Sequence, residues 1–353
     1  MNDDSLKLTT YFAERDRVDD GFLADALIDL YARHELQTSV LLRGAAGFGE
    51  RHHVHTDRLL TLSEDLPAVA VAVDTRSRIE DLLPSILGMK RRGFVTLERA
   101  RMLTGRLPAV QLPETLEEAT KLTLYIGRQE RVDGQPAFLA ICEVLQRRGV
   151  AGATALLGVD GTVHGVRRRA RFFGRNPDVP MMLIAVGDGG SIAASLPELN
   201  GLLERPLATL ERVRVCKRDG RLLAAPHQLP GADASGLPVW QKLMIYTSEQ
   251  ARIGRRPIHI ELLHRLRRSG ARGATVLRGV WGYHGDHSPH GDRMLQLRRH
   301  VPVLTILVDA PDRIAESFGI VDEVTSERGL VTSEMVPALA VMSHERRTGG
   351  LRL

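Results

Sequence analysis

The chain has 353 residues, of which 43% are hydrophobic and 26% charged, a composition typical of a soluble globular protein. Only 4% are aromatic, which weakens any function based on stacking nucleic-acid bases. The formal net charge of +5 is modest for this length and favours an anionic ligand only weakly. The N-terminus lacks a signal core, no apolar run could span a bilayer, and Cys142 and Cys216 fit packing positions in a reducing compartment. We therefore expect a cytoplasmic protein.

The sequence repeats itself three times with matches at fixed offsets. Each repeat opens with an alternating strand that contains a lysine and closes on a Thr-x-Glu triplet. The lysines are Lys7, Lys121 and Lys242, and the closing glutamates are Glu98, Glu211 and Glu334. This pattern predicts domains at residues 5–103, 119–216 and 240–341, joined by two connectors, the second of which is rich in Pro and Gly.

Within repeat 1, the periodicity of apolar residues predicts four strands and two helices. The expected elements are a strand at 7–12, a helix at 23–30, strands at 40–42 and 69–73, a helix at 79–86 and a strand at 94–97. Asp74 and Asp309 are expected to cap the second helix of repeats 1 and 3. The order βαββαβ is that of the ferredoxin-like α+β fold, which leaves one sheet face bare. Three fused units can cover these faces by forming an intramolecular pseudo-trimer, so we expect a monomer.

The middle of repeat 1 resembles a known family. The segment 42–49 (LRGAAGFG), the pair His55-Thr56 and the segment 62–67 (LSEDLP) together resemble domain-of-unknown-function family 190, and repeat 3 shows the same pattern at 277–283 and His290. Members of that family are similar in fold to PII signalling proteins, which are trimers of ferredoxin-like units that bind adenine nucleotides between subunits. The resemblance implies a PII-like sensor that regulates a transporter or an enzyme.

The glycine-rich segment and its flanks are the best candidate for a ligand site. Glycines allow positive φ and let backbone N–H groups approach an anion, while a guanidinium can pair with a phosphate or carboxylate. The candidate ligand-binding residues are Arg43, Gly44, Gly47, Gly49, His55, Arg58, Arg171, Arg278, Gly279, Gly282, His290 and Arg293. The alternative interpretation is that the glycines only shape a hairpin and that the arginines are solvated.

Repeat 2 departs from this pattern. Leu157 stands where the other repeats have Arg43 and Arg278, and a basic run follows at 167–169. We expect one anion site to be lost or rebuilt there. The basic run is either a solvated loop or a segment that binds an acidic partner.

The histidines near the glycines raise the possibility of a metal site, which the sequence supports less well than an anion site. His52 and His55, like His287 and His290, are three residues apart, which suits one metal only on a helix. The segment lacks helical periodicity and repeat 2 has no matching pair, so we predict no metal site.

No nucleophile elbow, phosphate-binding Walker loop or pair of catalytic carboxylates is recognisable, so we predict that the protein is not an enzyme. The favoured function is a sensor that binds a small anion, such as an adenine nucleotide, in clefts between repeats. A structural adaptor without a ligand is the first alternative. RNA binding is less favoured, because an RNA-binding ferredoxin-like sheet needs aromatic residues that the last strand of repeat 3 lacks.

Overall fold

Repeat 1 of the computed structural model contains four long strands and two helices. They are β1 (Asn2–Ala13), α1 (Leu23–Arg33), β4 (Thr38–Phe48), β6 (Pro67–Thr75), α2 (Arg76–Met89) and β7 (Arg92–Thr104). The strands are antiparallel in the order β7–β1–β6–β4. The structure describes residues 2–19, 21–49, 55–56, 65–89, 92–109, 112, 119–169, 179–284, 290–291, 301–343, 346–351 and 353.

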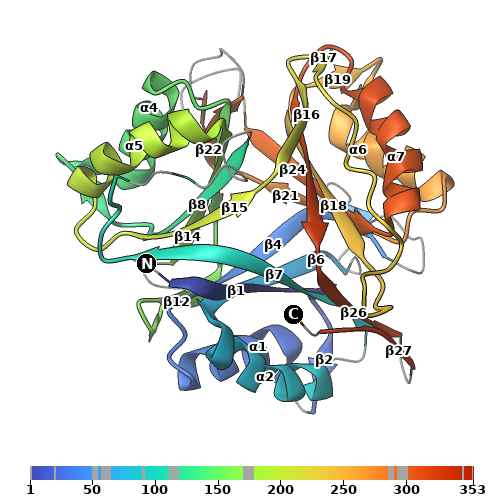
Figure 1. The fold of residues 1–353 in the computed structure, drawn as a ribbon, viewed down its shortest axis with the longest axis horizontal. Helices are drawn as coiled ribbons and strands as arrows, with labels where there is room; N and C mark the ends of the chain where they lie inside the picture. Colours follow the sequence, from blue (N-terminus) through green and yellow to red (C-terminus); the bar gives the residue numbers. More distant parts are fainter. Residues whose placement is uncertain are drawn as a thin grey trace.

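Repeats 2 and 3 have the same element order and the same strand order. Repeat 2 consists of β8 (Thr120–Gly127), α4 (Ala137–Arg147), β11 (Gly152–Leu157), β14 (Pro180–Gly187), α5 (Gly189–Leu202) and β15 (Leu207–Arg212). Repeat 3 consists of β18 (Trp240–Ser248), α6 (Ile258–Arg268), β21 (Ala274–Arg278), β24 (Pro302–Asp309), α7 (Pro311–Val324) and β25 (Leu330–Val336). The three repeats and the α+β class are therefore confirmed. The helix pairs lie at three outer corners and the strands meet in the middle (Figure 1).

The first seam between repeats is made by the strand that follows the first helix. β4 extends well beyond the predicted 40–42, and its second half pairs with β21 of repeat 3. Likewise β12 (Asp160–Val163) of repeat 2 pairs with β4, and β22 (Trp281–His284) of repeat 3 pairs with β11. Each repeat thus donates one strand segment to a neighbour in a closed cycle.

The second seam is made by the last strand of each repeat and its extension. The end of β7 pairs with β15, β16 (Arg214–Arg218) pairs with β25, and β26 (Ala338–Ser343) pairs with β7. These pairings run from repeat 1 to 2, from 2 to 3 and from 3 back to 1. These pairings join 21 of the described strands into one sheet that closes on itself, and six short strands form three separate hairpins.

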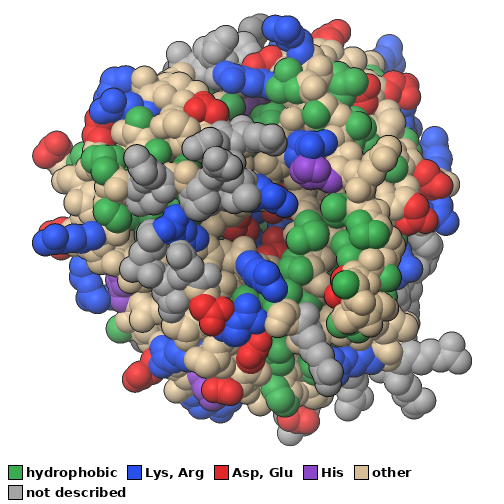
Figure 2. Space-filling view, viewed as in Figure 1, with side chains coloured by type: hydrophobic (Ala, Val, Ile, Leu, Met, Phe, Trp, Pro, Cys, Tyr) green, Lys and Arg blue, Asp and Glu red, His purple; other side chains and the backbone are tan. Residues whose placement is uncertain are grey.

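Alternating side chains on each strand divide the interior into three outer cores and one central core. Leu6 and Leu8 of β1 pack with Leu27 of α1 in an outer core, whereas Tyr11 belongs to the central one. The central core unites apolar residues from all three repeats, including Val71 and Ile184. The sheet faces that a lone unit would expose are therefore buried. The outer face drawn in Figure 2 carries charges of both signs side by side, in keeping with the modest net charge.

The predicted helix caps are wrong. The carboxylate of Asp74 accepts from the backbone N–H of Gln37 at 2.9 Å, and that of Asp309 accepts from the N–H of Arg272 at 3.1 Å. Both residues therefore tie the end of the third strand to the loop before the second strand. A side-chain cap is present in repeat 2 instead, where Asp188 accepts from the N–H of Ser191 at 2.8 Å.

The connectors are built into the ring. Leu107 and Leu112 of the first connector are buried in the outer core of repeat 2. The second connector begins with part of β16 and with β17 (Arg221–Leu222). The C-terminal tail forms β27 (Arg346–Gly350) against β26 and buries Leu351 in repeat 1. Arg76 of α2 holds both ends of the chain, since it bonds Asp4 at 2.6 Å and the carbonyl oxygen of Leu353 at 3.0 Å.

We predict that the protein is a monomer in solution, because every seam is satisfied within one chain. Light scattering coupled to size exclusion should give a mass of 39.0 kDa that does not change with protein concentration. A mass of three chains would show that seams form between molecules rather than within one.

Candidate functional site

The paired glycines lie where a strand of one repeat crosses onto the next. A Cβ atom on Gly44 would come within 2.5 Å of Pro67, and one on Gly47 within 2.7 Å of the carbonyl oxygen of Ala274 in repeat 3. Gly279 is similarly limited by Pro302 at 2.7 Å, and a Cβ on Gly282 would land on the carbonyl oxygen of Ala153. Close approach of the neighbouring repeat at the first seam therefore accounts for Gly47 and Gly282, whereas Gly44 and Gly279 are limited first by a proline of their own repeat.

The two described arginines beside these glycines have carboxylate partners. Arg43 pairs with Glu14 at 3.0 Å, and Arg278 pairs with Glu249 at 2.5 Å. In repeat 2 both members of the pair differ, because Leu157 replaces the arginine and Arg128 replaces the glutamate. The pairs are exposed and contribute about 1 kcal/mol or less each. An anion bound at either arginine would compete with its glutamate.

The other predicted ligand residues are placed in part. Gly49 is exposed just after β4, and a Cβ atom added to it would have no neighbouring atom within 4 Å. The backbones of His55 in β5 (His55–Thr56) and His290 in β23 (His290–Gly291) pair with those of Gly47 and Gly282. Arg58, Arg171 and Arg293 lie outside the described residues, as do His52 and His287. The structure thus brings a histidine backbone beside the second glycine in repeats 1 and 3.

The basic run of repeat 2 has an acidic partner within the same chain. Arg167 bonds Asp160 at 2.7 Å and also pairs with Asp29 on α1 of repeat 1. Arg169 reaches Asp25 on the same helix at 2.7 Å. The segment after β12 is therefore held against α1 by ion pairs.

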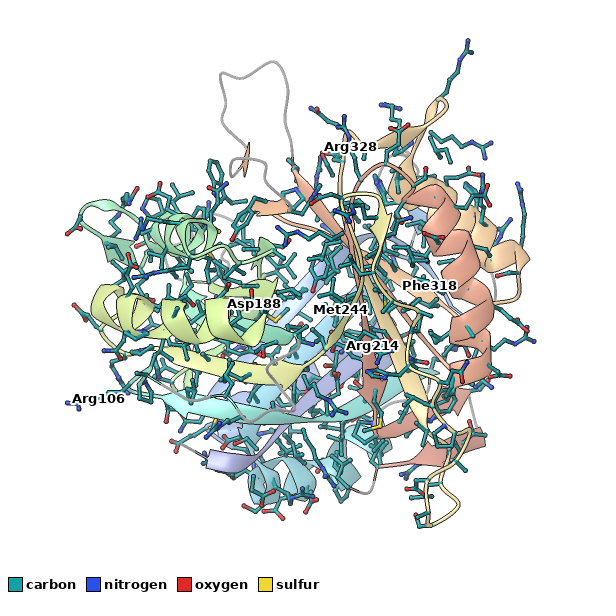
Figure 3. The ribbon with its side chains drawn as sticks, turned by 45° about the horizontal axis from the view of Figure 1, so that its top comes forward. Arg106, Asp188, Arg214, Met244, Phe318 and Arg328 are labelled. Carbon is teal, nitrogen blue, oxygen red and sulfur yellow. The ribbon has the colours of Figure 1, made fainter. Side chains whose placement is uncertain are left out.

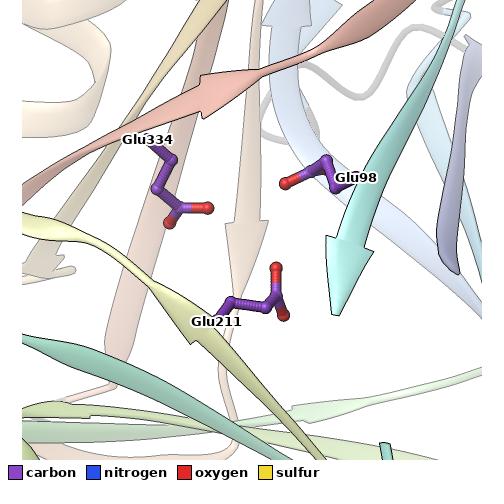
Figure 4. Close-up of side chains that lie close together, drawn as sticks. All are labelled: Glu98, Glu211 and Glu334. Atoms are coloured by element: carbon purple, nitrogen blue, oxygen red, sulfur yellow. The ribbon is translucent and has the colours of Figure 1, made fainter. Parts of the chain in front are cut away.

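A ring of six buried charges lies at the centre of the molecule. The lysines come from β1, β8 and β18, and the glutamates come from β7, β15 and β25; all six are at most 7% exposed. Within each repeat a lysine stands opposite its own glutamate on the neighbouring strand, as Lys7 does opposite Glu98. The three carboxylates point toward one another around the centre (Figure 4).

Each lysine of this charge ring joins two glutamates from different repeats. Lys7 contacts Glu98 at 3.4 Å and also Glu211, and Lys121 contacts Glu211 at 3.1 Å and also Glu334. Lys242 completes the cycle by contacting Glu334 at 2.9 Å and Glu98. Charges of opposite sign alternate around the ring, so its formal charge is zero. In every case the contact to the other repeat is shorter than the contact within the repeat.

Burial and pairing act in opposite directions on these groups. Burial disfavours the charged form of Glu211, but Lys121 and Lys7 outweigh it and hold the pKa of that carboxyl below its usual value. Burial likewise opposes charge on Lys7, while Glu211 and Glu98 raise its pKa above the ordinary value. Glu211 and Lys7 consequently keep their charges at neutral pH.

The centre contains little free space. A cavity of about 40 Å³ adjoins the lysines and is lined also by Tyr11, Tyr125 and Met244. This volume suits a few water molecules. Met244, labelled in Figure 3, lies 4.0 Å from the ammonium nitrogen of Lys121. Although the glutamate oxygens lie within 4.8 Å of one another, a spacing that could suit a metal, the three ammonium groups already supply the positive charge.

The charge ring was missed by the sequence-based search, although a signal for it was present. A lysine in the first strand and a glutamate in the last strand recur in all three repeats, each within an otherwise apolar segment. A charged residue at a strand position that faces a core requires a partner of opposite charge. The recurrence therefore indicated three buried ion pairs. That the three pairs meet in one place follows only from the closure of the three repeats around the centre.

The fold and the site define a class of protein: three homologous α+β units in one chain, closed into a ring around buried alternating charges. The chain belongs to the DUF190 family, described as "Uncharacterized ACR", whose model matches residues 5–102, 119–215 and 240–338. A UPF0166 protein of Aquifex aeolicus (strain VF5) is 31% identical over 98 residues, which cover 28% of this chain and 90% of that protein.

A solved structure, aspartate kinase from Synechocystis, is similar with a TM-score of 0.26 and 10% identity. The match covers 96% of this chain and 45% of the kinase chain, and so weak a likeness supports no inference. None of the described helices is long and apolar enough to cross a membrane.

We predict that Gly282→Ala destabilises the protein by about 1–3 kcal/mol, because the added methyl group meets the backbone of β11. Gly201→Ala on α5 is the matched control; it has nothing within 4 Å of the added carbon and should stabilise the helix by about 0.5–1 kcal/mol. Urea unfolding measures both. Equal free energies of unfolding for the two variants would contradict the close approach.

We predict that Glu211→Gln costs about 3–5 kcal/mol, because it leaves a buried positive charge without compensation. Glu198→Gln, which disrupts exposed pairs with Arg147 and Arg148, should cost about 1 kcal/mol or less. Since the folded pKa of Glu211 is depressed, its contribution is present above about pH 4.3 and lost as the pH falls through the folded value.

The difference in stability between wild type and Glu211→Gln should therefore shrink in acid. Combining Glu211→Gln with Lys121→Met restores neutrality and should recover part of the loss, as measured by urea unfolding. A cost for Glu211→Gln no larger than that for Glu198→Gln would show that the variant does not leave a buried lysine without compensation.

Proposed function

We propose that the protein is a non-enzymatic, PII-like sensor. In this proposal the three units are ferredoxin-like and form an intramolecular pseudo-trimer around the charge ring. The observation that carries it is the crossing of each glycine motif onto a neighbouring repeat, at the first seam. The clefts between subunits are where the family resemblance leads us to expect an adenine nucleotide.

The first seam is formed three times, once between each pair of repeats, and these three contacts do not have equal capacity for an anion. Where repeat 2 meets repeat 1, Arg167 and Arg169 are already held by carboxylates of α1 and by Asp160. The other two seams keep the arginine, the paired glycines and the histidine that follows. We therefore propose fewer than three anion sites in a chain, with the loops of repeats 1 and 3 contacting a regulated transporter or enzyme.

A structural adaptor without a ligand is the second candidate. Two observations favour it: the second glycine of each motif is required by strand crossing, and both Arg43 and Arg278 have partners on their own repeat. RNA binding is less well supported, because the sheet faces that would stack bases lie in the central core, where Tyr11 is 6% exposed and stacks on Phe94.

We predict that calorimetric titration with ATP, ADP or AMP shows binding at fewer than three sites. Arg43→Ala and Arg293→Ala should each weaken it roughly 10- to 100-fold, since each removes a charge-assisted contact of about 1.5–3 kcal/mol. Arg313→Ala is the matched control, because Arg313 is an exposed, ion-paired arginine on α7.

The outcomes separate the two candidates. Weakened binding in the two test variants with normal binding in Arg313→Ala supports the sensor. No nucleotide binding by the wild-type protein favours the adaptor, and three equal sites would contradict the asymmetry between the seams.

A further inference from the structure

A large cavity lies away from the first seam, between α2 of repeat 1 and two segments that fold back over it. Its volume is about 1150 Å³. One wall is formed by Leu83 and Leu87 of α2, and the other by Leu237 of the second connector and Leu351 of the C-terminal tail. The size and the apolar walls suit a small-molecule site.

The equivalent groove of repeat 2 shows what such a surface accepts. There the first connector lays Leu107 and Leu112 into a core with Leu196 of α5, which is the counterpart of Leu83. The backbone N–H of Leu107 donates to the side chain of Asn200 at 2.7 Å. In repeat 1, Leu87 replaces this asparagine, so the groove over α2 lacks that polar contact and suits an apolar chain.

The charged groups that line the cavity differ in availability. Glu80 pairs with Arg76, and Asp233 accepts from the N–H groups of Ser235 and Leu237 at 2.9 Å. Among the described residues, no carboxylate pairs with the exposed side chains of the lining residues Arg99 and Arg347. The cavity therefore presents apolar walls, two carboxylates that already have partners, and two guanidinium groups that pair with no carboxylate in the described part of the chain.

We propose that this cavity binds an amphipathic anion, a molecule with an unbranched hydrocarbon chain and a carboxylate or phosphate head. The chain lies along Leu83 and Leu87 in the place that connector leucines take in repeat 2, and the head pairs with Arg99 and Arg347. The site is independent of the nucleotide proposal, because its lining contains no glycine motif and no residue of the first seam.

The probe is monomeric dodecanoate, titrated calorimetrically into the full-length protein. We expect one site in each chain. Dodecanol and dodecyltrimethylammonium have the same chain and a neutral or positive head, and should bind about tenfold more weakly or not at all. Equal binding of all three would overturn the assignment of the arginines to the head group.

Two pairs of variants locate the site. Gly88 lines the cavity and has nothing within 4 Å of an added Cβ, so Gly88→Trp should fill the space and abolish binding. Gly201→Trp is its matched control at the equivalent position of α5, which is also open. Arg99→Gln combined with Arg347→Gln should weaken binding about tenfold, whereas Arg212→Gln, the counterpart of Arg99 in repeat 2, should leave it unchanged.

The proposal is overturned if the wild-type protein does not bind dodecanoate, or if Gly201→Trp weakens binding as much as Gly88→Trp. Vesicles of anionic phospholipid provide a second arm that separates a free acid from a membrane lipid. Association with vesicles without binding of monomeric dodecanoate would also overturn the proposal. Normal unfolding curves for the variants exclude misfolding as the cause of lost binding.

Discussion

The whole assembly depends on six charges that have been taken out of water at its centre. Each lysine of the charge ring needs two carboxylates, and one of them comes from another repeat. If one repeat left the ring, its own lysine and glutamate would be exposed, and charged groups of the other repeats would lose a partner. An apolar centre, in contrast, would tolerate many rotations of one repeat against another. The desolvation cost means that the ring adds less to stability than to specificity of the arrangement, and it sets one register for all three repeats.

The seams show how much of an apparent binding motif is used by the fold itself. Gly44 and Gly282 are limited by neighbouring backbone, and the arginines of the second strand, Arg43 and Arg278, are held by glutamates of their own repeat. Repeat 2 goes further and replaces both members of that pair, while its basic run is bound to α1. An anionic ligand at the first seam must therefore bind arginines that already have carboxylate partners. Binding would exchange the glutamate carboxylate for the anion of the ligand.

The periodicity of the sequence predicted the elements well and the contacts between repeats poorly. Leu23 to Leu30 lies on α1 and Ile79 to Ile86 on α2, because one apolar face determines each helix. The strands extend beyond their predicted ends, since β4 and β7 continue as partners of other repeats and no local pattern records a partner that is more than a hundred residues away. Asp74 was assigned to a helix cap because its position just before a helix is a local pattern, whereas its bond to Gln37 of the same repeat depends on the tertiary fold. The charge ring could have been predicted from the sequence, because its lysines and glutamates recur in every repeat.

The presence of all three repeats in a single chain also changes which side chains can occupy equivalent positions at the centre. In a ring of three identical chains, a side chain on the axis meets two copies of itself, so every substitution there is made three times. Here Met244 occupies the position held by Thr9 and Thr123, and all three line the same small central cavity. One long thioether fits where three would exceed the space. Because the three positions belong to one chain, each of these central side chains can differ from the other two.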